Sequence, residues 1–290
     1  MINFDLIIGI IQIVLIATTP LVFASIGELV TEKSGVLNLG VEGMMLVGAV
    51  TAFVTLVITG SYFLAFIFSI FSGILMSGLF AFLVLILMSN QVATGLALTI
   101  FGIGLSSMIG KEYIGTPING LTPWYFVILS FLIVFLISYF FYKTKSGLIL
   151  RAIGESHNSA HALGYNVLKV RFAAILFGGS MCALAGSYMS ICYAPMWQEG
   201  MTAGRGWIAL ALVVFATWKP GRILIGAYIF GGVTILQMNL QAFGLRIPAQ
   251  FFNMAPYLAT MIVLVIISSN KLRIKLNTPS SLTIPFYKGS

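Results

Sequence analysis

The chain has 290 residues, of which 59% are hydrophobic and only 8% are charged, and its mean hydropathy is +1.06. This composition excludes an ordinary soluble domain and is typical of a protein that lies in a membrane. The formal net charge of +8 does not by itself indicate a nucleic-acid partner, since an excess of Lys and Arg is typical of the cytoplasmic loops of membrane proteins.

Apolar segments recur along the whole chain, and several approach the roughly 20 residues that a helix needs to cross about 30 Å of hydrocarbon. Short runs of Gly, Pro, Ser, Asn or charged residues separate them. We therefore predict an all-α polytopic membrane protein with about nine hydrophobic helical segments, some of them broken or re-entrant. The segments are 6–27, 36–59, 62–88, 92–110, 124–142, 171–193, 207–218, 223–243 and 250–270.

The distribution of basic residues predicts the orientation of these segments. With the N-terminus outside, only Lys111, Arg205 and Arg246 fall in outer loops. All the other Lys and Arg residues then fall on the inner side, as the positive-inside rule expects. This orientation places the C-terminus in the cytoplasm. The inner residues are Lys33, Lys143, Lys145, Arg151, Lys169, Arg171, Lys219, Arg222, Lys271, Arg273, Lys275 and Lys288.

The second segment opens with SGVLNLGVEGMM, residues 34–45, in which glycines interrupt the start of a helix. Asn38 and Glu42 would lie one turn apart on this helix, followed by Gly43. A carboxylate inside a membrane usually faces a cavity or a partner. Glu42 could therefore contact the solute, tie the broken helix to its neighbours through free backbone N–H groups, or lie hydrated at the inner interface. For Glu28 we expect an interfacial position.

A second irregular segment, 207–218, is only about 18 Å long as a helix and is too short to cross alone. The glycine-rich stretch EGMTAGRG precedes it and includes Gly204 and Gly206. A pair of short, glycine-interrupted segments in the two halves of a chain points to a transport path. We therefore place Asn38, Glu42, Gly43, Gly204 and Gly206 on a candidate translocation path.

Residues 143–171 form the longest polar stretch between two apolar segments. Its middle, SHNSAHALGYN, predicts a short helix, because Ser156 suits the N-cap and Gly164 suits the left-handed position after the end. Such a loop is either a docking surface or a solvated connector. For His157 and His161 we expect solvated positions and no metal site. The predicted domains are a permease domain, 1–270, and a basic cytoplasmic tail, 271–290.

Four stretches carry a resemblance to a known family. The stretch EKSGVLNLGVEGMMLVGA, residues 32–49, resembles the signature of permease subunits of bacterial ABC importers of the nucleoside and simple-sugar type. Residues 154–167, GESHNSAHALGYNV, resemble the cytoplasmic loop of that family, although the family usually has Asn-Pro where this chain has Ser156-His157. Residues 93–107 and 204–227 are also similar, so the resemblance covers most of the chain.

The resemblance implies a permease without an ATPase of its own, in the bacterial cytoplasmic (inner) membrane. It implies that an ABC ATPase docks on the loop containing Gly154, Glu155, Ala160 and Gly164. It also implies that a second permease subunit completes the channel, often as a heterodimer, and that an extracytoplasmic solute-binding protein or lipoprotein delivers the solute. The implied solute is a nucleoside, with simple sugars and branched-chain amino acids as alternatives.

The residues give no indication of an enzyme. The chain contains no GxxxxGK[ST] phosphate loop and no HExxH motif, and its only Asp is Asp5. We therefore expect no catalytic residues, no metal, no cofactor and no nucleic-acid partner, with ATP hydrolysis in a separate subunit. A stand-alone secondary transporter that couples transport to an ion through Glu42 is the remaining alternative.

Overall fold

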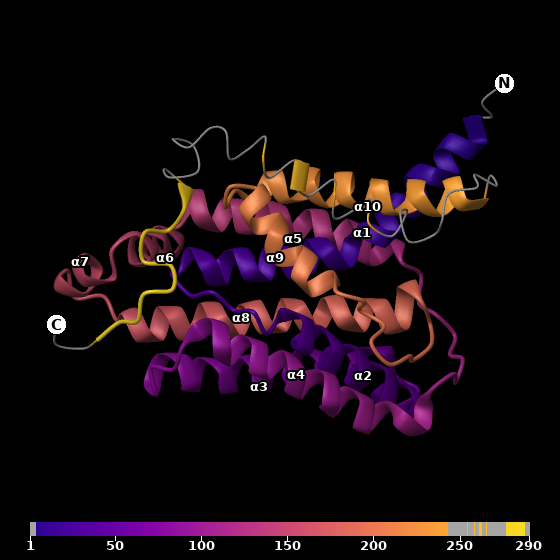
Figure 1. The fold of residues 1–290 in the computed structure, drawn as a ribbon, viewed down its shortest axis with the longest axis horizontal. Helices are drawn as coiled ribbons and strands as arrows, with labels where there is room; N and C mark the ends of the chain where they lie inside the picture. The colour runs from indigo at the N-terminus through magenta and orange to yellow at the C-terminus, as the bar shows by residue number, and fades with distance from the viewer. Residues whose placement is uncertain are drawn as a thin grey trace.

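A computed structural model of the protein describes residues 4–242 and 277–287, together with five single positions between 254 and 265. The predicted apolar segment 250–270 therefore lies outside the described residues, apart from those positions. We call the end of the bundle that carries residues 145–162 the α7 end, and the opposite end the Trp197 end (Figure 1).

The described part of the chain is helical, with β structure limited to isolated bridges such as Ile114 with Trp197. Six helices, counted with their π- and 3-10-helical extensions, are long and apolar enough to cross a membrane. The elements are α1 Phe4–Lys33, α2 Val41–Thr59, α3 Tyr62–Ala81, η1 Phe82–Ile86, α4 Gln91–Gly110, η2 Lys111–Tyr113, α5 Trp124–Lys143, α6 Lys145–Glu155, α7 His157–Ala162, α8 Val167–Tyr188, η3 Met189–Tyr193, α9 Arg205–Phe215 and α10 Pro220–Ala242.

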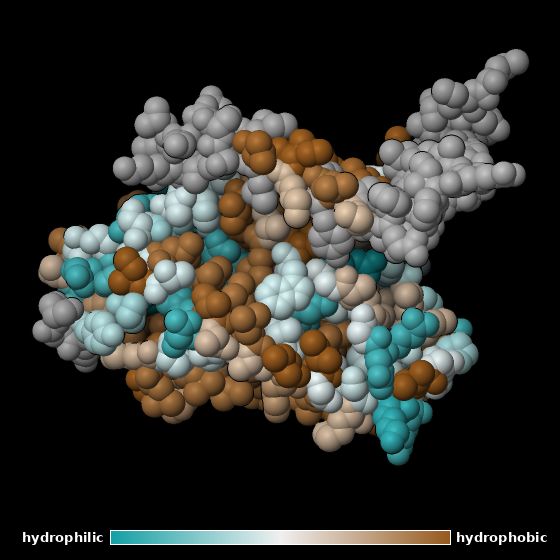
Figure 2. Space-filling model, viewed as in Figure 1, coloured by the Kyte–Doolittle hydropathy of each residue, from teal (hydrophilic) through white to brown (hydrophobic). Residues whose placement is uncertain are grey.

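The first eight predicted segments correspond to helices α1 to α5 and α8 to α10, which confirms the polytopic helical class. The sixth begins at Val167 rather than at residue 171, because the Asn166 side chain accepts a hydrogen bond from the Lys169 N–H at 3.0 Å and caps the helix there. Large apolar side chains on α3 to α5 face outward, as for Ile100, which is 71% exposed. On the face in Figure 2, hydrophilic residues gather toward the two ends, and hydrophobic ones cover much of the surface between.

Helix α8 lies at the centre of the bundle, and small residues allow its neighbours to approach closely (Figure 1). A Cβ at Gly186 would overlap the carbonyl oxygen of Met45 on α2, and a Cβ at Gly48 would lie 2.7 Å from the Cβ of Ala183. These contacts also set the relative depth of the helices. Met45 and Gly48 pack against Gly186 and Ala183, in the second half of the span 167–193, so α2, which begins at Val41, starts about halfway along that span.

Replacing Gly186 with alanine should destabilise the bundle by about 1–3 kcal/mol, because the added methyl group has no space against α2. The matched control is Gly104→Ala on α4, where nothing lies within 4 Å of the added Cβ. That substitution should leave the protein unchanged or stabilise it by up to about 1 kcal/mol. Thermal unfolding in detergent checks both variants. Equal midpoints for the two would contradict the packing described here.

Two reversals of the chain reach the middle of the bundle from opposite ends. Helix α1 runs to the α7 end, residues 34–40 return without helical structure, and α2 then continues toward the Trp197 end (Figure 1). Helix α8 with η3 runs to the Trp197 end, residues 194–204 return, and α9 continues toward the α7 end. The two units therefore have similar paths of opposite direction, as in transporters built from inverted repeats. The triplet Glu-Gly-Met occurs in both units, at 42–44 and 199–201, but not in equivalent places, since Glu42 lies in α2 and Glu199 in the returning segment.

Candidate functional site

The segment 34–40 is non-helical at membrane depth, so its backbone groups need partners other than water. Side chains supply several of them. The Leu37 N–H donates to Gln91 Oε1 at 2.9 Å, the Asn38 N–H to Glu28 Oε1 at 2.9 Å, and the Gly40 N–H to the Asn38 side-chain oxygen at 2.9 Å. The break before α2 is therefore a hydrogen-bonded element of defined structure.

Glu42 joins the two broken units. One carboxylate oxygen accepts hydrogen bonds from the Thr202 hydroxyl and from the Gly204 N–H, the latter at 2.8 Å. The other oxygen accepts one from the Gly206 N–H at 2.6 Å. The side chain is only 5% exposed, so bulk hydration contributes little to it. Hydrogen bonds from three donors compensate for the burial of the carboxylate.

The location of Glu42 is electrostatically favourable, because the N-termini of α2 and α9 meet there. The first N–H groups of a helix have no partner within the helix, and the helix dipole adds positive potential at this end. Glu42 lies in the first turn of α2 and accepts from N–H groups at the start of α9. A buried carboxylate thus satisfies donors that the break in the chain leaves free.

Glycine is required at both α9 positions for different reasons. Gly204 has φ +81°, in the left-handed region that favours glycine. A Cβ at Gly206 would lie 2.6 Å from the Glu42 backbone nitrogen. Gly43 packs instead against α4, where a Cβ would lie 2.8 Å from the Leu98 carbonyl oxygen. The five residues predicted for the path therefore lie in one region, at the junction of α2 with α4 and α9, where all but the half-buried Gly204 are buried.

Two further residues, Glu28 and Thr202, belong to this region. The interfacial position expected for Glu28 is wrong: the side chain is 0% exposed, because segment 34–40 returns into the bundle beside it. Its Oε2 has no hydrogen-bond partner within the described part of the protein. Thr202 was not singled out, and its contact with Glu42 spans 160 residues of sequence, which no local pattern reveals.

The loop at the α7 end contains two helices rather than the one predicted. The short helix at 157–162 is confirmed, with Ser156 capping it through the Ser159 N–H at 3.3 Å and Gly164 at φ +88°. Helix α6 precedes it and was not predicted from the sequence. The sequence feature that marks its start is the N-cap residue Thr144, whose hydroxyl accepts a hydrogen bond from the Gly147 N–H at 3.1 Å.

The loop residues identified from the family resemblance fall into two groups. Gly154 packs where a Cβ would overlap the Lys33 carbonyl oxygen at the end of α1, and Ala160 is buried beside Phe286. Glu155 and Gly164 are exposed, and Glu155 accepts a hydrogen bond from the Ser280 hydroxyl at 3.2 Å. The loop therefore has a packed inner side and an open outer side.

Residues 277–287 pack against this loop, and Arg171 is the residue that connects them. Arg171 is 0% exposed. Its guanidinium donates to the carbonyl oxygen of Ser34 at 3.0 Å, to that of Ile284 at 3.1 Å, and to His157 Nδ1 at 3.4 Å. One buried cation thus links the start of segment 34–40, the C-terminal residues and α7.

The solvated position expected for His157 is also wrong, since this ring is only 8% exposed, whereas His161 is exposed. Burial, and then the positive charge of Arg171, lower the pKa of His157 below its usual 6.5. The neutral ring accepts from Arg171, and the unfolded chain binds a proton more readily. The contribution of His157 to stability is therefore complete above pH 6.5 and is lost as the pH falls below that value.

We expect the thermal unfolding midpoint to decrease when the pH is lowered from 7.5 to 5.5. The substitution His157→Gln should make this decrease smaller. Glutamine keeps an acceptor for Arg171 but does not titrate in this range. The matched control is His161→Gln on the same short helix, which should keep the full pH dependence. An unchanged pH dependence in His157→Gln would contradict the role assigned to this ring.

The chemistry available here is that of hydrogen bonding and conformational change. Among the described residues, no group of three or more His, Cys, Asp or Glu side chains could hold a metal ion. Cys182 and Cys192 are buried and free. The arrangement consists of two broken helices that share a buried carboxylate, connected to a compact loop at one end.

Comparison with known proteins identifies the group to which the chain is similar. The sequence profile described as the permease component of the branched-chain amino acid transport system matches residues 10–268. A putative glucose ABC transporter permease of Haloferax volcanii is 36% identical, over 94% of this chain and 96% of that protein. A nucleoside ABC transporter permease of Lactococcus lactis subsp. cremoris is 30% identical, over 86% and 89%.

A guanosine ABC transporter permease of Bacillus subtilis is 27% identical, over 95% of both chains. No solved structure gives a significant match. The family profile covers most of the chain, and the relatives align over nearly their whole length. The described part of this chain also has six helices that are long and apolar enough to cross a membrane. The chain therefore belongs to the family of ABC transporter permease components and is a multi-pass protein of the cytoplasmic membrane.

Proposed function

We propose that this chain is the permease subunit of an ATP-driven importer and that its solute is a nucleoside. The observation that supports this best is the junction at Glu42, where two broken helices start from the middle of the bundle. Half-helices that meet near the middle of a membrane are typical of solute paths, because freed backbone groups are tolerated there only with protein or cavity around them.

Within this path we assign Glu42 a structural role. Both of its oxygens already accept hydrogen bonds from Thr202, Gly204 and Gly206. A solute that used this carboxylate would have to displace donors that nothing else satisfies. We therefore assign Glu42, with Asn38 at the other side of the break, to holding the two half-helices together while neighbouring surfaces contact the solute.

The proposed driving step is a movement of the loop at the α7 end. ABC permeases work with an ATPase subunit and a solute-binding protein, and we propose that the ATPase docks on the outer side of α6 and α7 around Glu155. The exposed position of Glu155 next to the packed Gly154 supports this assignment. Arg171 offers a route for the movement from α7 to segment 34–40. A second, related permease subunit would complete the channel. We also propose that the N-terminus of this chain lies outside the cytoplasm.

Two relatives carry nucleoside and guanosine in their names, and they support a nucleoside as the solute. A simple sugar is the second candidate, because the relative at 36% identity is named as a putative glucose permease. A pentose and a hexose present similar hydroxyl groups, so the choice depends on pocket shape and on the binding protein. A ligand screen of the binding protein encoded beside this chain separates the two solutes.

Co-purification tests the proposed driving step. When the chain is expressed with its neighbouring genes, an ABC ATPase should co-purify with it. The substitutions Gly154→Leu and Glu155→Arg should remove the ATPase from the complex. The matched control is Glu199→Arg, an exposed glutamate in the segment that returns from the Trp197 end. Retention of the ATPase by both loop variants would contradict docking at this loop.

A further inference from the structure

A pocket of about 420 Å³ lies at the α7 end, where several elements finish. Its walls come from the end of α1, the end of α5, one side of α6, the turn between α9 and α10, and the C-terminal residues. The lining residues are Lys33, Phe141, Tyr142, Leu148, Arg151, Ala152, Glu155, Trp218, Lys219 and Asn277. The pocket shares Glu155 with the surface proposed for the ATPase, but neither that surface nor the solute path accounts for its basic residues.

Three cationic side chains, Lys33, Arg151 and Lys219, line this one pocket from three different elements. The charges of Arg151 and Lys219 both act on Lys33. The Lys33 ammonium donates to the Asn277 carbonyl oxygen at 2.6 Å, and the opposite charges of Glu155 and Glu32 also act on it. The Nε of Arg151 is buried and has no hydrogen-bond partner in the described part of the protein. An unpaired buried donor of a charged group is costly and indicates a missing acceptor.

The acidic residues near the pocket do not cancel this charge. Glu155 is the only carboxylate in the lining, and it also accepts from Ser280. Glu32 lies behind the wall, is 1% exposed and accepts from the Trp218 indole N–H at 2.6 Å. An anion that entered the pocket would therefore meet three cations and one carboxylate.

The depth of the pocket matches the headgroup region of a bilayer. Lys33 is the last residue of one membrane span, and Tyr142 lies at the end of another. Trp218 and Tyr142 are aromatic residues of the kind found at membrane interfaces. Arg151 lies over the Tyr142 ring, 5.3 Å from its centroid, which holds the guanidinium at the pocket.

We propose that this pocket binds the phosphate of an anionic phospholipid headgroup, held by Arg151, Lys33 and Lys219. Basic pockets between helix ends recognise such headgroups by charge and by hydrogen bonding to phosphate oxygens. Glu155 at the rim supplies an acceptor for the hydroxyl groups of a glycerol headgroup. The bound lipid would join α1, α6 and the α9–α10 turn, next to the loop proposed for the ATPase.

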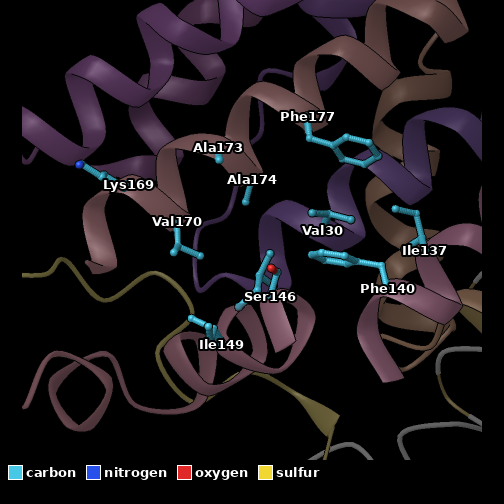
Figure 3. A pocket seen from close by; sticks show the side chains of 11 residues that line it. Val30, Ile137, Phe140, Ser146, Ile149, Lys169, Val170, Ala173, Ala174 and Phe177 are labelled. Carbon is cyan, nitrogen blue, oxygen red and sulfur yellow. The ribbon is translucent and has the colours of Figure 1, made fainter. Parts of the chain in front are cut away.

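The other face of α6 provides the internal control. There, an apolar cavity of about 460 Å³ lies between α1, α5, α6 and α8 (Figure 3). At about 100° per residue, Ser146, Ile149 and Leu150 project to the side opposite Arg151 and Glu155. Lys169 is the one charged residue in that lining, and its ammonium points away from the other lining side chains in Figure 3.

Lipid-dependent thermal stability tests the proposal. The full chain, with the partners that co-purify, is delipidated in a neutral detergent. Its unfolding midpoint is then measured against added phosphatidylglycerol, phosphatidylcholine with the same acyl chains, or inorganic phosphate with chloride at equal ionic strength. Phosphatidylglycerol should raise the midpoint in a saturable way, because a ligand that binds only the folded state stabilises it. Phosphatidylcholine and inorganic phosphate should not.

The variants Arg151→Gln and Lys219→Gln should each raise the half-saturating fraction of phosphatidylglycerol about fivefold, which corresponds to the attraction of one basic side chain to anionic lipid. Lys169→Gln should leave it unchanged. Equal shifts of the unfolding midpoint with the two lipids would overturn the proposal, and so would an equal rise of the half-saturating fraction in all three variants. A saturable rise of the midpoint with inorganic phosphate would also overturn it and would assign the pocket to a free anion. Lys219→Gln keeps the test decisive if Arg151→Gln fails to fold. No transport is measured, so the result is independent of the proposed solute.

Discussion

Replacing Glu42 with alanine should abolish transport and lower the stability of the folded chain by at least about 3 kcal/mol. The substitution leaves the Thr202 hydroxyl and the N–H groups of Gly204 and Gly206 without an acceptor in a buried place. Each unpaired buried donor costs about 1–3 kcal/mol. Solute uptake and the thermal unfolding midpoint in detergent measure the two effects. Normal uptake by Glu42→Ala would contradict the junction as described.

The substitution Glu42→Gln distinguishes the structural role from ion coupling. Glutamine offers one acceptor oxygen and one NH₂ group, so at least one N–H of the α9 start loses its partner. The structural role predicts that stability and uptake fall together, by less than in Glu42→Ala. A proton-coupling role predicts full stability with uptake lost at every pH. The exposed Glu199, replaced by glutamine, is the control for loss of a charge and should show neither effect.

Replacing Arg171 with methionine should destabilise the α7 end by about 3 kcal/mol and uncouple ATP hydrolysis from uptake. The carbonyl oxygens of Ser34 and Ile284 and the ring of His157 would lose the donor that they share. Methionine fills much of the same volume, so the lost hydrogen bonds dominate the effect. The measurements are the unfolding midpoint, and ATPase activity together with solute uptake in the assembled transporter.

Lys169→Met is the matched control for Arg171, since Lys169 lies on the same helix but is exposed. It should preserve stability, ATP hydrolysis and uptake. If Arg171→Met hydrolysed ATP and transported solute like the unchanged protein, the connection from α7 to segment 34–40 would carry no function. Loss of stability without loss of coupling would restrict Arg171 to a structural role.

Local sequence signals predicted much of the fold. Ser156 and Gly164 marked the two ends of α7, because capping and left-handed turns depend on a few neighbouring residues. The apolar runs predicted the spans for a similar reason, since the length of a span follows from bilayer thickness. The shortness of the segment after Gly206 was also visible, and the helix there has 11 residues.

Contacts between distant segments were not predictable in the same way. Glu28 lies close to a basic turn in sequence, which suggested an interface, but the return of segment 34–40 buries it. The same applies to His157, whose burial depends on Arg171 and on Phe286 near the C-terminus. For Glu42, the sequence left three roles open, because the choice depended on where residues 202–206 fold.

ATP-driven uptake in proteoliposomes tests the central claim most directly. The chain is reconstituted with the proposed partners, an ABC ATPase, a second permease subunit and a solute-binding protein, and accumulation of a radiolabelled nucleoside is followed. We predict accumulation that requires ATP and the binding protein and that persists when an uncoupler removes the proton gradient. Accumulation by this chain alone, driven by an ion gradient and abolished by the uncoupler, would contradict its assignment as the permease subunit of an ATP-driven importer.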